Sequence, residues 1–143
     1  RSPDDRRTRA NHESQLGHVL ALAGREPKAD ALLTAALATQ RELAGEPSVE
    51  VAETAGRLAM LRLRQGRVAE AKTLIDASVE QYEREDPDPH QHAEAWFRRA
   101  QVLAAAGEHA AARAEAERAA KRYAELGDQP ARRRAVEEWL AHP

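Results

Sequence analysis

The sequence contains no cysteine, and this absence excludes several kinds of site at once. Disulfide bonds, thiolate catalysis and cysteine-bound zinc all need the side chain that is missing. Aromatic residues are also scarce, because two tryptophans, two tyrosines and one phenylalanine would make a thin core for a β-sandwich. No apolar run approaches the roughly 18 residues of a membrane span, and no charged start followed by an apolar stretch indicates a signal peptide.

Charges of both signs are abundant and nearly balanced. Lys and Arg number 22 against 24 Asp and Glu, and the formal net charge of −2 gives no general attraction to nucleic acid. High charge mixed with abundant Ala and Leu is typical of exposed helices. The 143 residues suffice for one domain with a buried core. Because the chain begins at Arg1 without a methionine, we expect it to be a piece of a longer protein.

Three isolated glycines mark an internal repeat. Gly24, Gly66 and Gly107 stand 42 and 41 residues apart, a period typical of stacked helical hairpins. The fifth residue after each glycine is alanine, and the fifth before it is valine or leucine. Each unit therefore predicts a helix, a left-handed glycine turn and a second helix that doubles back. The small residues after the turns predict close contact between the paired helices.

Capping signals predict where the helices start. Ser2 stands before Pro3, Ser48 precedes an apolar-periodic stretch, and Asp88 stands three residues before Gln91 in capping-box spacing. With the glycine turns, these signals predict helices over about residues 3–22, 27–43, 49–64, 68–84, 90–105, 109–125 and 130–141.

The helix expected after Gly127 has two different faces. Its apolar residues share one face, whereas Arg132 to Arg134 lie on the other side, which suits a helix that caps the last hairpin. We expect Trp139 to pack onto that hairpin, with a role in seating a neighbouring domain as the alternative. Tyr82 and Tyr123 both follow a turn glycine by sixteen residues, and this shared register predicts packing at the hairpin ends.

The residues at these offsets resemble the tetratricopeptide repeat, whose consensus positions here hold Trp96, Ala100, Leu103, Gly107, Ala112 and Ala119. Residues 43–54 look like the proline-containing linker of the roughly 42-residue variety. That variety occurs in kinesin light chains and in bacterial multidomain regulators and Ser/Thr kinases. The resemblance covers about residues 10–127, with departures at Arg99, where an apolar residue is usual, and at Glu13, which replaces the tryptophan of the third repeat.

The resemblance implies an all-α fold. We expect one domain over residues 1–143, a right-handed superhelical array of three hairpins at about 3–43, 49–84 and 90–125, closed by the capping helix. It also implies a concave groove, lined by the first helix of each hairpin, of the kind that usually binds a peptide. By register, the groove residues are Asn11, Ser14, Gln15, His18, Glu53, Arg57, Met60, Arg64, Glu94, Phe97, Arg98 and Gln101.

The arginines of this groove suggest an acidic ligand. Arg57, Arg64 and Arg98 have the fork of donors that matches a carboxylate, and Met60 and Phe97 would supply apolar pockets nearby. The alternative is that these arginines are solvated and contribute little. One subtype of the family clamps a C-terminal carboxylate at fixed groove positions. Here only Arg98 matches that clamp well, and an acidic residue at another of its positions would repel a carboxylate, so we reject the clamp.

Metal binding and catalysis find little support. Within residues 86–92, Asp88 is better used as a cap, and His90 and His92 face about 200° apart on a helix. Ser14 and His18 lie four residues apart, but no nucleophile elbow accompanies them. Each glycine is isolated at a turn, so there is no phosphate-binding loop. We therefore expect no metal, no cofactor and no enzymatic activity.

These observations favour a non-enzymatic, cytoplasmic scaffold that binds a protein or peptide segment, an acidic one if the groove arginines make contact. We expect neither nucleic acid nor a membrane as partner, because the basic residues are interspersed with acids and no aromatic residue interleaves with them. Two rivals stay open. One is a sensor whose groove binds a peptide or domain in cis and controls an attached kinase or DNA-binding domain. The other is a self-association module in which an exposed end of the array pairs with its copy.

Overall fold

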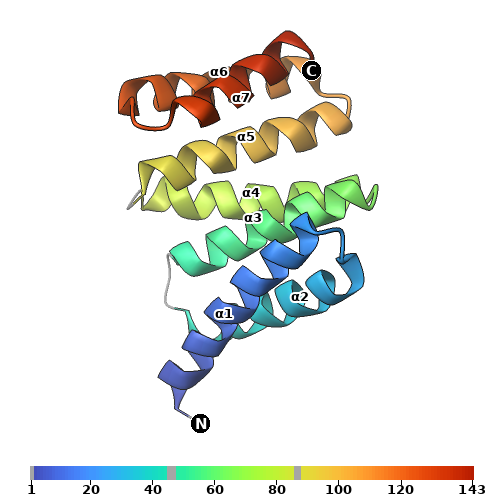
Figure 1. Ribbon diagram of the computed structural model, residues 1–143, viewed down its shortest axis with the longest axis vertical. Coiled ribbons are helices and arrows are strands. Elements are labelled where there is room, and N and C mark those ends of the chain that lie inside the picture. Colours follow the sequence, from blue (N-terminus) through green and yellow to red (C-terminus); the bar gives the residue numbers. More distant parts are fainter. Residues whose placement is uncertain (1, 45–47, 86–87) are drawn as a thin grey trace.

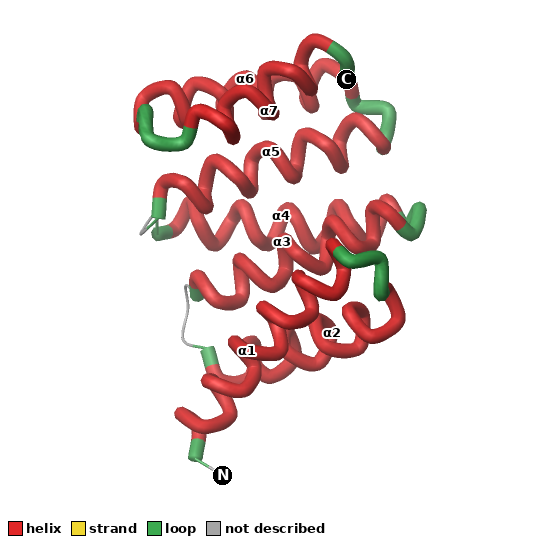
Figure 2. Tube along the Cα trace, viewed as in Figure 1, coloured by secondary structure: helices red, strands yellow, loops and turns green. Residues whose placement is uncertain are grey.

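The computed structural model describes residues 2–44, 48–85 and 88–143, and within these ranges the chain forms seven α-helices and no strand (Figures 1 and 2). The helices are α1 (Pro3–Leu22), α2 (Glu26–Leu43), α3 (Val49–Arg64), α4 (Val68–Arg84), α5 (Pro89–Ala105), α6 (His109–Leu126) and α7 (Pro130–Ala141). They stack as an all-α repeat array with α1 and α2 at one end and α6 and α7 at the other (Figure 1).

Every helix begins and ends within one residue of its predicted position, because the signals that define these ends are local. The first helix of each hairpin has a side-chain cap. Ser2 Oγ accepts from Asp5 N at 3.2 Å, Ser48 Oγ from Val51 N at 3.3 Å, and Asp88 Oδ1 from His90 N at 3.0 Å. The second helix of each hairpin lacks such a cap and begins just after a glycine turn.

The turn glycines adopt the left-handed conformation that the repeat pattern predicts. Gly24, Gly66 and Gly107 have φ angles of 79°, 77° and 84°. A Cβ atom at any of these positions would meet nothing within 4 Å, so the backbone angle alone requires glycine here. The alanine five residues after each turn is at most 1% exposed, which confirms the predicted close contact.

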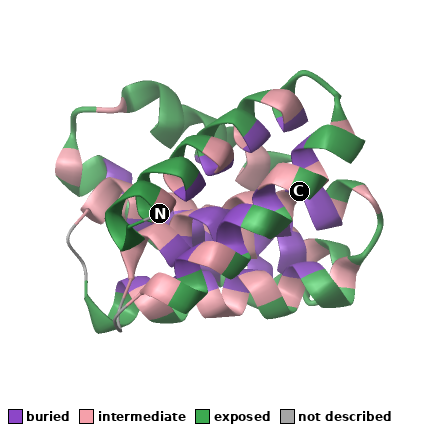
Figure 3. Ribbon diagram, turned by 90° about the horizontal axis from the view of Figure 1, so that it is seen from below, coloured by how far each residue is buried: buried purple, intermediate pink, exposed green. Residues whose placement is uncertain are grey.

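Small residues let the paired helices approach each other closely, and Gly17 of α1 shows how tightly. A Cβ atom on Gly17 would lie 2.8 Å from Cγ of Leu33 in α2, and Leu33 is fully buried. Buried residues lie where helices face one another, whereas exposed residues lie on the outside of the stack (Figure 3). The hairpins join through contacts of α2 with α3 and of α4 with α5.

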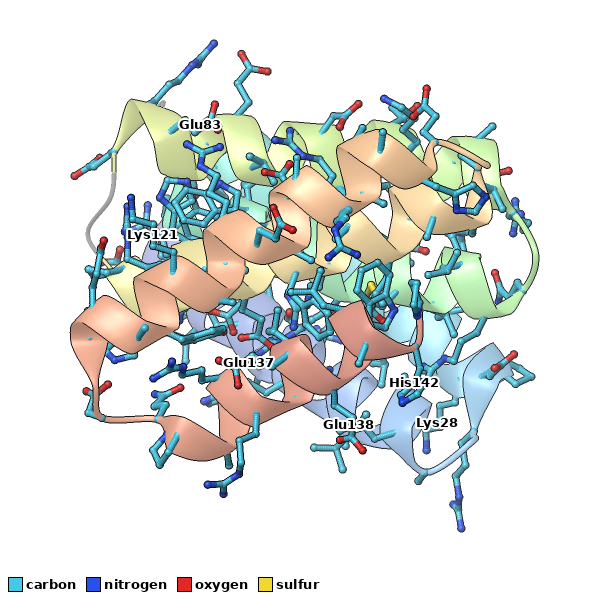
Figure 4. The ribbon with its side chains drawn as sticks, turned by 90° about the horizontal axis from the view of Figure 1, so that it is seen from above. Lys28, Glu83, Lys121, Glu137, Glu138 and His142 are labelled. Carbon is cyan, nitrogen blue, oxygen red and sulfur yellow. The ribbon has the colours of Figure 1, made fainter. Side chains whose placement is uncertain are left out.

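The few aromatic residues gather toward the C-terminal end. Tyr82, Trp96 and Tyr123 are buried in one core cluster, which confirms the predicted packing of the two tyrosines. α7 covers the last hairpin, and Trp139 meets Phe97 of α5 edge-on with ring centroids 5.8 Å apart. This contact confirms that Trp139 packs on the hairpin. The outer surface of this end carries exposed Lys121, Glu137 and Glu138 (Figure 4).

Arg99, the departure from the family pattern, is explained by its neighbours. Its Nε donates to the buried carboxylate of Glu115 in α6, and its Nη1 lies 3.7 Å from Asp76 Oδ1 in α4. An ion-pair network therefore fills the space between the second and third hairpins where an apolar side chain is usual.

Candidate functional site

A polar cavity of about 310 Å³ opens over the first helices of the three hairpins. His18 comes from α1, Glu53 and Arg57 from α3, Glu94 and Arg98 from α5, and Arg132 from α7. We call these six residues the charged groove. These six side chains stand on packed helices, so their relative positions are held by the fold. Asp88 and Gln129, which precede α5 and α7, also line the cavity.

Each of the three guanidinium groups in the charged groove pairs with a carboxylate. Arg57 binds Glu53 one turn earlier in α3, and Arg98 Nη2 donates to Glu94 Oε1 at 3.0 Å. Arg132 Nη1 reaches across from α7 to Glu94 Oε2 at 2.9 Å. Glu94 thus joins two arginines from different helices. The side chains of Arg57 and Arg98 are each only 14% exposed, so little water screens their charge.

Two features outside the groove position its arginines. Ser14 of α1 is buried, with its Oγ 2.6 Å from Thr54 Oγ1, and it accepts a hydrogen bond from Arg57 Nη1 at 3.0 Å. Gly56 of α3 leaves room for Arg98, because a Cβ atom there would lie 2.7 Å from Arg98 Nη1. Ser14 therefore orients an arginine inside the molecule.

The arginines of the groove lower the pKa of two neighbouring groups, His18 and Glu94. Burial lowers the pKa of His18, and Arg57 and Arg98 lower it further, so the imidazole is neutral at pH 7. Burial raises the pKa of Glu94, but Arg98 and Arg132 outweigh burial and bring the pKa of this carboxyl below its ordinary value. The carboxylate is therefore ionised, and the arginines set the sign of the field that acts on His18.

The structure brings five of the predicted groove residues to one cavity: His18, Glu53, Arg57, Glu94 and Arg98. Asn11 and Ser14 line an adjoining cavity of about 140 Å³ that shares Arg57 with the charged groove. Asn11 is engaged there, since it donates to Glu50 and accepts from Gln40.

The remaining predicted residues lie outside the charged groove. Met60 is partly buried and Arg64 is exposed. Gln101 donates to the carbonyl oxygen of Phe97 at 3.4 Å. Phe97 does not stand open to a ligand in the expected way, because Trp139 packs against its ring.

The helical pattern missed one contact of Arg132. Arg132 lies away from the apolar face of the capping helix as expected, with its side chain 51% exposed, but it also pairs with Glu94 of α5, which the pattern does not indicate. The missed pair between His90 and Asp128 holds the loop before α7, with His90 Nε2 donating to Asp128 Oδ1 at 2.7 Å. No local signal joins residues so far apart in sequence.

The residues considered for a metal site have other roles. Asp88 caps α5, His90 pairs with Asp128, and His92 is buried with its ring 4.2 Å from that of Trp96. Asp86 lies outside the described residues. Across residues 2–44, 48–85 and 88–143, no group of three His, Cys, Asp or Glu side chains is arranged to hold a metal ion. In the same ranges no helix has the length and apolar character needed to cross a bilayer.

Comparison with known proteins identifies the class. The sequence profile described as tetratricopeptide repeat matches residues 8–83 and again residues 50–125, two matches displaced by one repeat. The chain therefore belongs to the tetratricopeptide repeat family. Its repeat period and fold agree with the predicted kinesin-light-chain-like variety.

One solved structure illustrates the fold. The chain resembles the crystal structure of BtubC (BKLC) from P. vanneervenii with a TM-score of 0.73 and 22% sequence identity over 83% of this chain. It spans 48% of the length of that chain, and a likeness at this identity shows the fold alone. Among curated proteins, none matches.

Proposed function

We propose that the chain is a protein-binding module whose charged groove takes an extended acidic segment of a partner. Tetratricopeptide repeats generally mediate protein–protein interactions. The observation that carries the acidic preference is the convergence of Arg57, Arg98 and Arg132 on one cavity of about 310 Å³. Each guanidinium has five N–H donors, more than its present pairs use.

Glu94 does not oppose this ligand in the way that an isolated carboxylate would. Its charge is shared between Arg98 and Arg132, and a ligand carboxylate can take up the remaining donors of both. Hydrogen bonds to charged groups in such partly buried places contribute about 1.5–3 kcal/mol each. A segment with several acidic side chains would therefore bind through charge and through the fixed spacing of the arginines.

The test uses a fluorescent peptide of alternating Glu and Ala residues, its Gln counterpart, and two triple variants. Arg57→Gln, Arg98→Gln and Arg132→Gln together should weaken binding of the acidic peptide by about tenfold or more. The control combines Arg113→Gln, Arg133→Gln and Arg134→Gln, which removes the same charge from residues outside the groove. Equal affinity of the two variants, or equal binding of the Gln peptide, would refute the proposal.

A second candidate function is self-association through the outer face of α1. Leu16, Val19 and Leu22 lie along this face and are 49%, 58% and 69% exposed. Leu61 and Val102, which occupy the position of Val19 in the next two repeats, are fully buried. The face that the preceding hairpin covers in α3 and α5 is therefore bare in α1, and a second copy of the chain would bury it.

Sedimentation over a range of concentrations tests this second function. We expect dimers that the double variant Leu16→Glu and Val19→Lys abolishes, because charges would then have to be buried. Exposed Ala110→Glu and Ala111→Lys in α6 provide the matched control. A chain that stays monomeric at high concentration contradicts self-association and leaves the groove proposal unaffected.

A further inference from the structure

An apolar groove lies between α2 and α4, the second helices of the first two hairpins. It has a volume of about 430 Å³. Arg41, Arg62 and Glu70 form the charged part of its lining, and the other lining residues are Thr34, Leu37 and Ala38 of α2, Leu58 of α3, and Thr73 and Leu74 of α4. We call these six residues the apolar groove. Its volume falls within the range of about 300–1,000 Å³ that is usual for ligand sites.

The equivalent place between the second and third hairpins, where α4 lies beside α6, is the next junction of the array. Its side chains differ in character from those of the apolar groove. At the position of Leu58 the third repeat has Arg99, and at the position of Leu74 it has Glu115. Arg99 donates to Glu115 and lies near Asp76, so ion pairs fill the space. The same place in the fold is thus filled by charged side chains at one junction and lined by apolar ones at the other.

The exposed edges of the two junctions also differ in whether an ion pair joins their helices. Glu83 of α4, visible in Figure 4, lies 3.5 Å from Arg118 of α6 and ties the second junction together. The corresponding residues at the first junction are Arg41 and Ala77. Ala77 offers no charge, and Arg41 is exposed and makes no ion pair with any residue that the structure describes.

The other cation beside the apolar groove is already occupied. Arg62 bonds to Asp30 and Gln65 and lies 3.2 Å from Glu70. A carboxylate that arrives with a ligand would therefore meet Arg41 as the rim cation that has no ion pair within the part of the chain that the structure describes. Apolar walls and the exposed cation of Arg41 at the rim define the chemistry that the occupant must bring.

We propose that the apolar groove binds an amphipathic segment of a partner protein, which inserts a leucine or phenylalanine side chain between α2 and α4 and pairs an acidic side chain with Arg41. The inserted side chain leaves water for contact with Leu37, Leu58 and Leu74. The carboxylate supplies the pairing that Glu83 and Arg118 provide within the chain at the next junction. This site is separate from the charged groove and does not depend on it.

The experiment screens a displayed library of short random peptides against the chain and measures the affinity of the enriched peptides by fluorescence anisotropy. The test variant carries Ala38→Glu and Arg41→Glu, which give α2 the residues that α4 has at the equivalent positions, Glu80 and Glu83. Both positions are exposed, so the fold should be kept, and circular dichroism checks this. The control makes the same changes on α7, Ala135→Glu and Arg134→Glu, which are also exposed.

The expected peptides combine Leu or Phe with Asp or Glu, and their affinity falls about tenfold or more in the test variant but not in the control. They still bind the variant that carries Arg57→Gln, Arg98→Gln and Arg132→Gln, which separates this proposal from the function of the charged groove. Amide signals of Thr73 and Leu74 should shift on titration. The proposal is overturned if no peptide of this kind is enriched, if the test variant binds as well as the control, or if the groove proves to be covered by a second copy of the chain.

Discussion

Arg62 of α3 holds Asp30 of α2 with two parallel hydrogen bonds, Nη1 to Oδ2 at 2.7 Å and Nη2 to Oδ1 at 3.1 Å. The guanidinium is largely buried, and Gln65 donates to the same carboxylate at 3.2 Å. Because the two partners belong to different hairpins, this pair joins the first repeat to the second beside the apolar groove.

Removal of the carboxylate should destabilise the junction between the first two hairpins. Asp30→Ala leaves a buried guanidinium with fewer partners, and we expect the free energy of unfolding to fall by about 1.5–3 kcal/mol. Glu117→Ala is the control, because it breaks an exposed pair with Arg113 that contributes about 0–1 kcal/mol. Urea denaturation measures both, and equal losses would contradict the role of Asp30.

The same pair predicts a dependence on acid. Arg62 lowers the pKa of Asp30 from 3.8 to about 2. A depressed carboxyl pKa stabilises the fold above the unfolded value near 3.8, and this contribution is lost as the pH falls through about 2. The stability difference between wild type and Asp30→Asn should therefore be constant above about pH 4 and shrink below it. A difference that stays constant down to pH 2 would show that the pair does not shift this pKa.

Alanine substitution of two glycines, each in the first helix of a hairpin, should affect different properties: peptide binding for Gly56 and stability for Gly17. Gly56→Ala places a methyl group against the flexible end of Arg98, so we expect weaker binding of the acidic peptide. Stability should be unchanged or rise by up to about 1 kcal/mol through helix propensity. Gly17→Ala places the methyl group against Leu33 within the core, which should cost about 1–3 kcal/mol, less up to about 1 kcal/mol gained in helix propensity, and leave binding intact. Thermal unfolding and peptide affinity, measured on both variants, separate the two effects. If Gly56→Ala binds like wild type, Arg98 does not need this space.

The histidines of the groove region should titrate on opposite sides of the ordinary value of 6.5. The hydrogen bond to Asp128 raises the pKa of His90, whereas burial and the nearby arginines lower that of His18. A raised histidine pKa stabilises the fold below the unfolded value and loses this effect as the pH rises through the folded value. NMR titration measures both, and Asp128→Asn should bring His90 back toward 6.5 without moving His18. Two histidines that titrate together would contradict the assigned environments.

The helices could be predicted almost completely because their ends depend on neighbours in sequence. Ser48 and Asp88 are recognisable as caps from the residues that follow them, and Gly66 as a turn from its repetition. The repeat register also assigns Arg57 and Arg98 to equivalent positions of their hairpins, and both line the cavity of the charged groove.

The sequence could not show which edge of α7 faces α5. A helical pattern gives the two faces of α7 but not the neighbour that each edge meets, so it does not indicate that the exposed Arg132 pairs with Glu94. For the same reason Phe97 was expected in the open groove, although Trp139 packs against its ring. The difference between the two junctions depends on the ion pairs of Arg99 with Asp76 and Glu115, which join different helices and so have no local signal in the sequence.

The two ends of the stack are chemically unequal. Val136 of α7 is buried on the last hairpin, whereas Val19 of α1 is more than half exposed. A helical hairpin fused ahead of α1 could pack directly against the exposed apolar face of α1. A hairpin fused behind α6 would first have to displace α7. Lengthening of the solenoid by protein engineering should therefore succeed in one direction, with added units joined at the amino-terminal side.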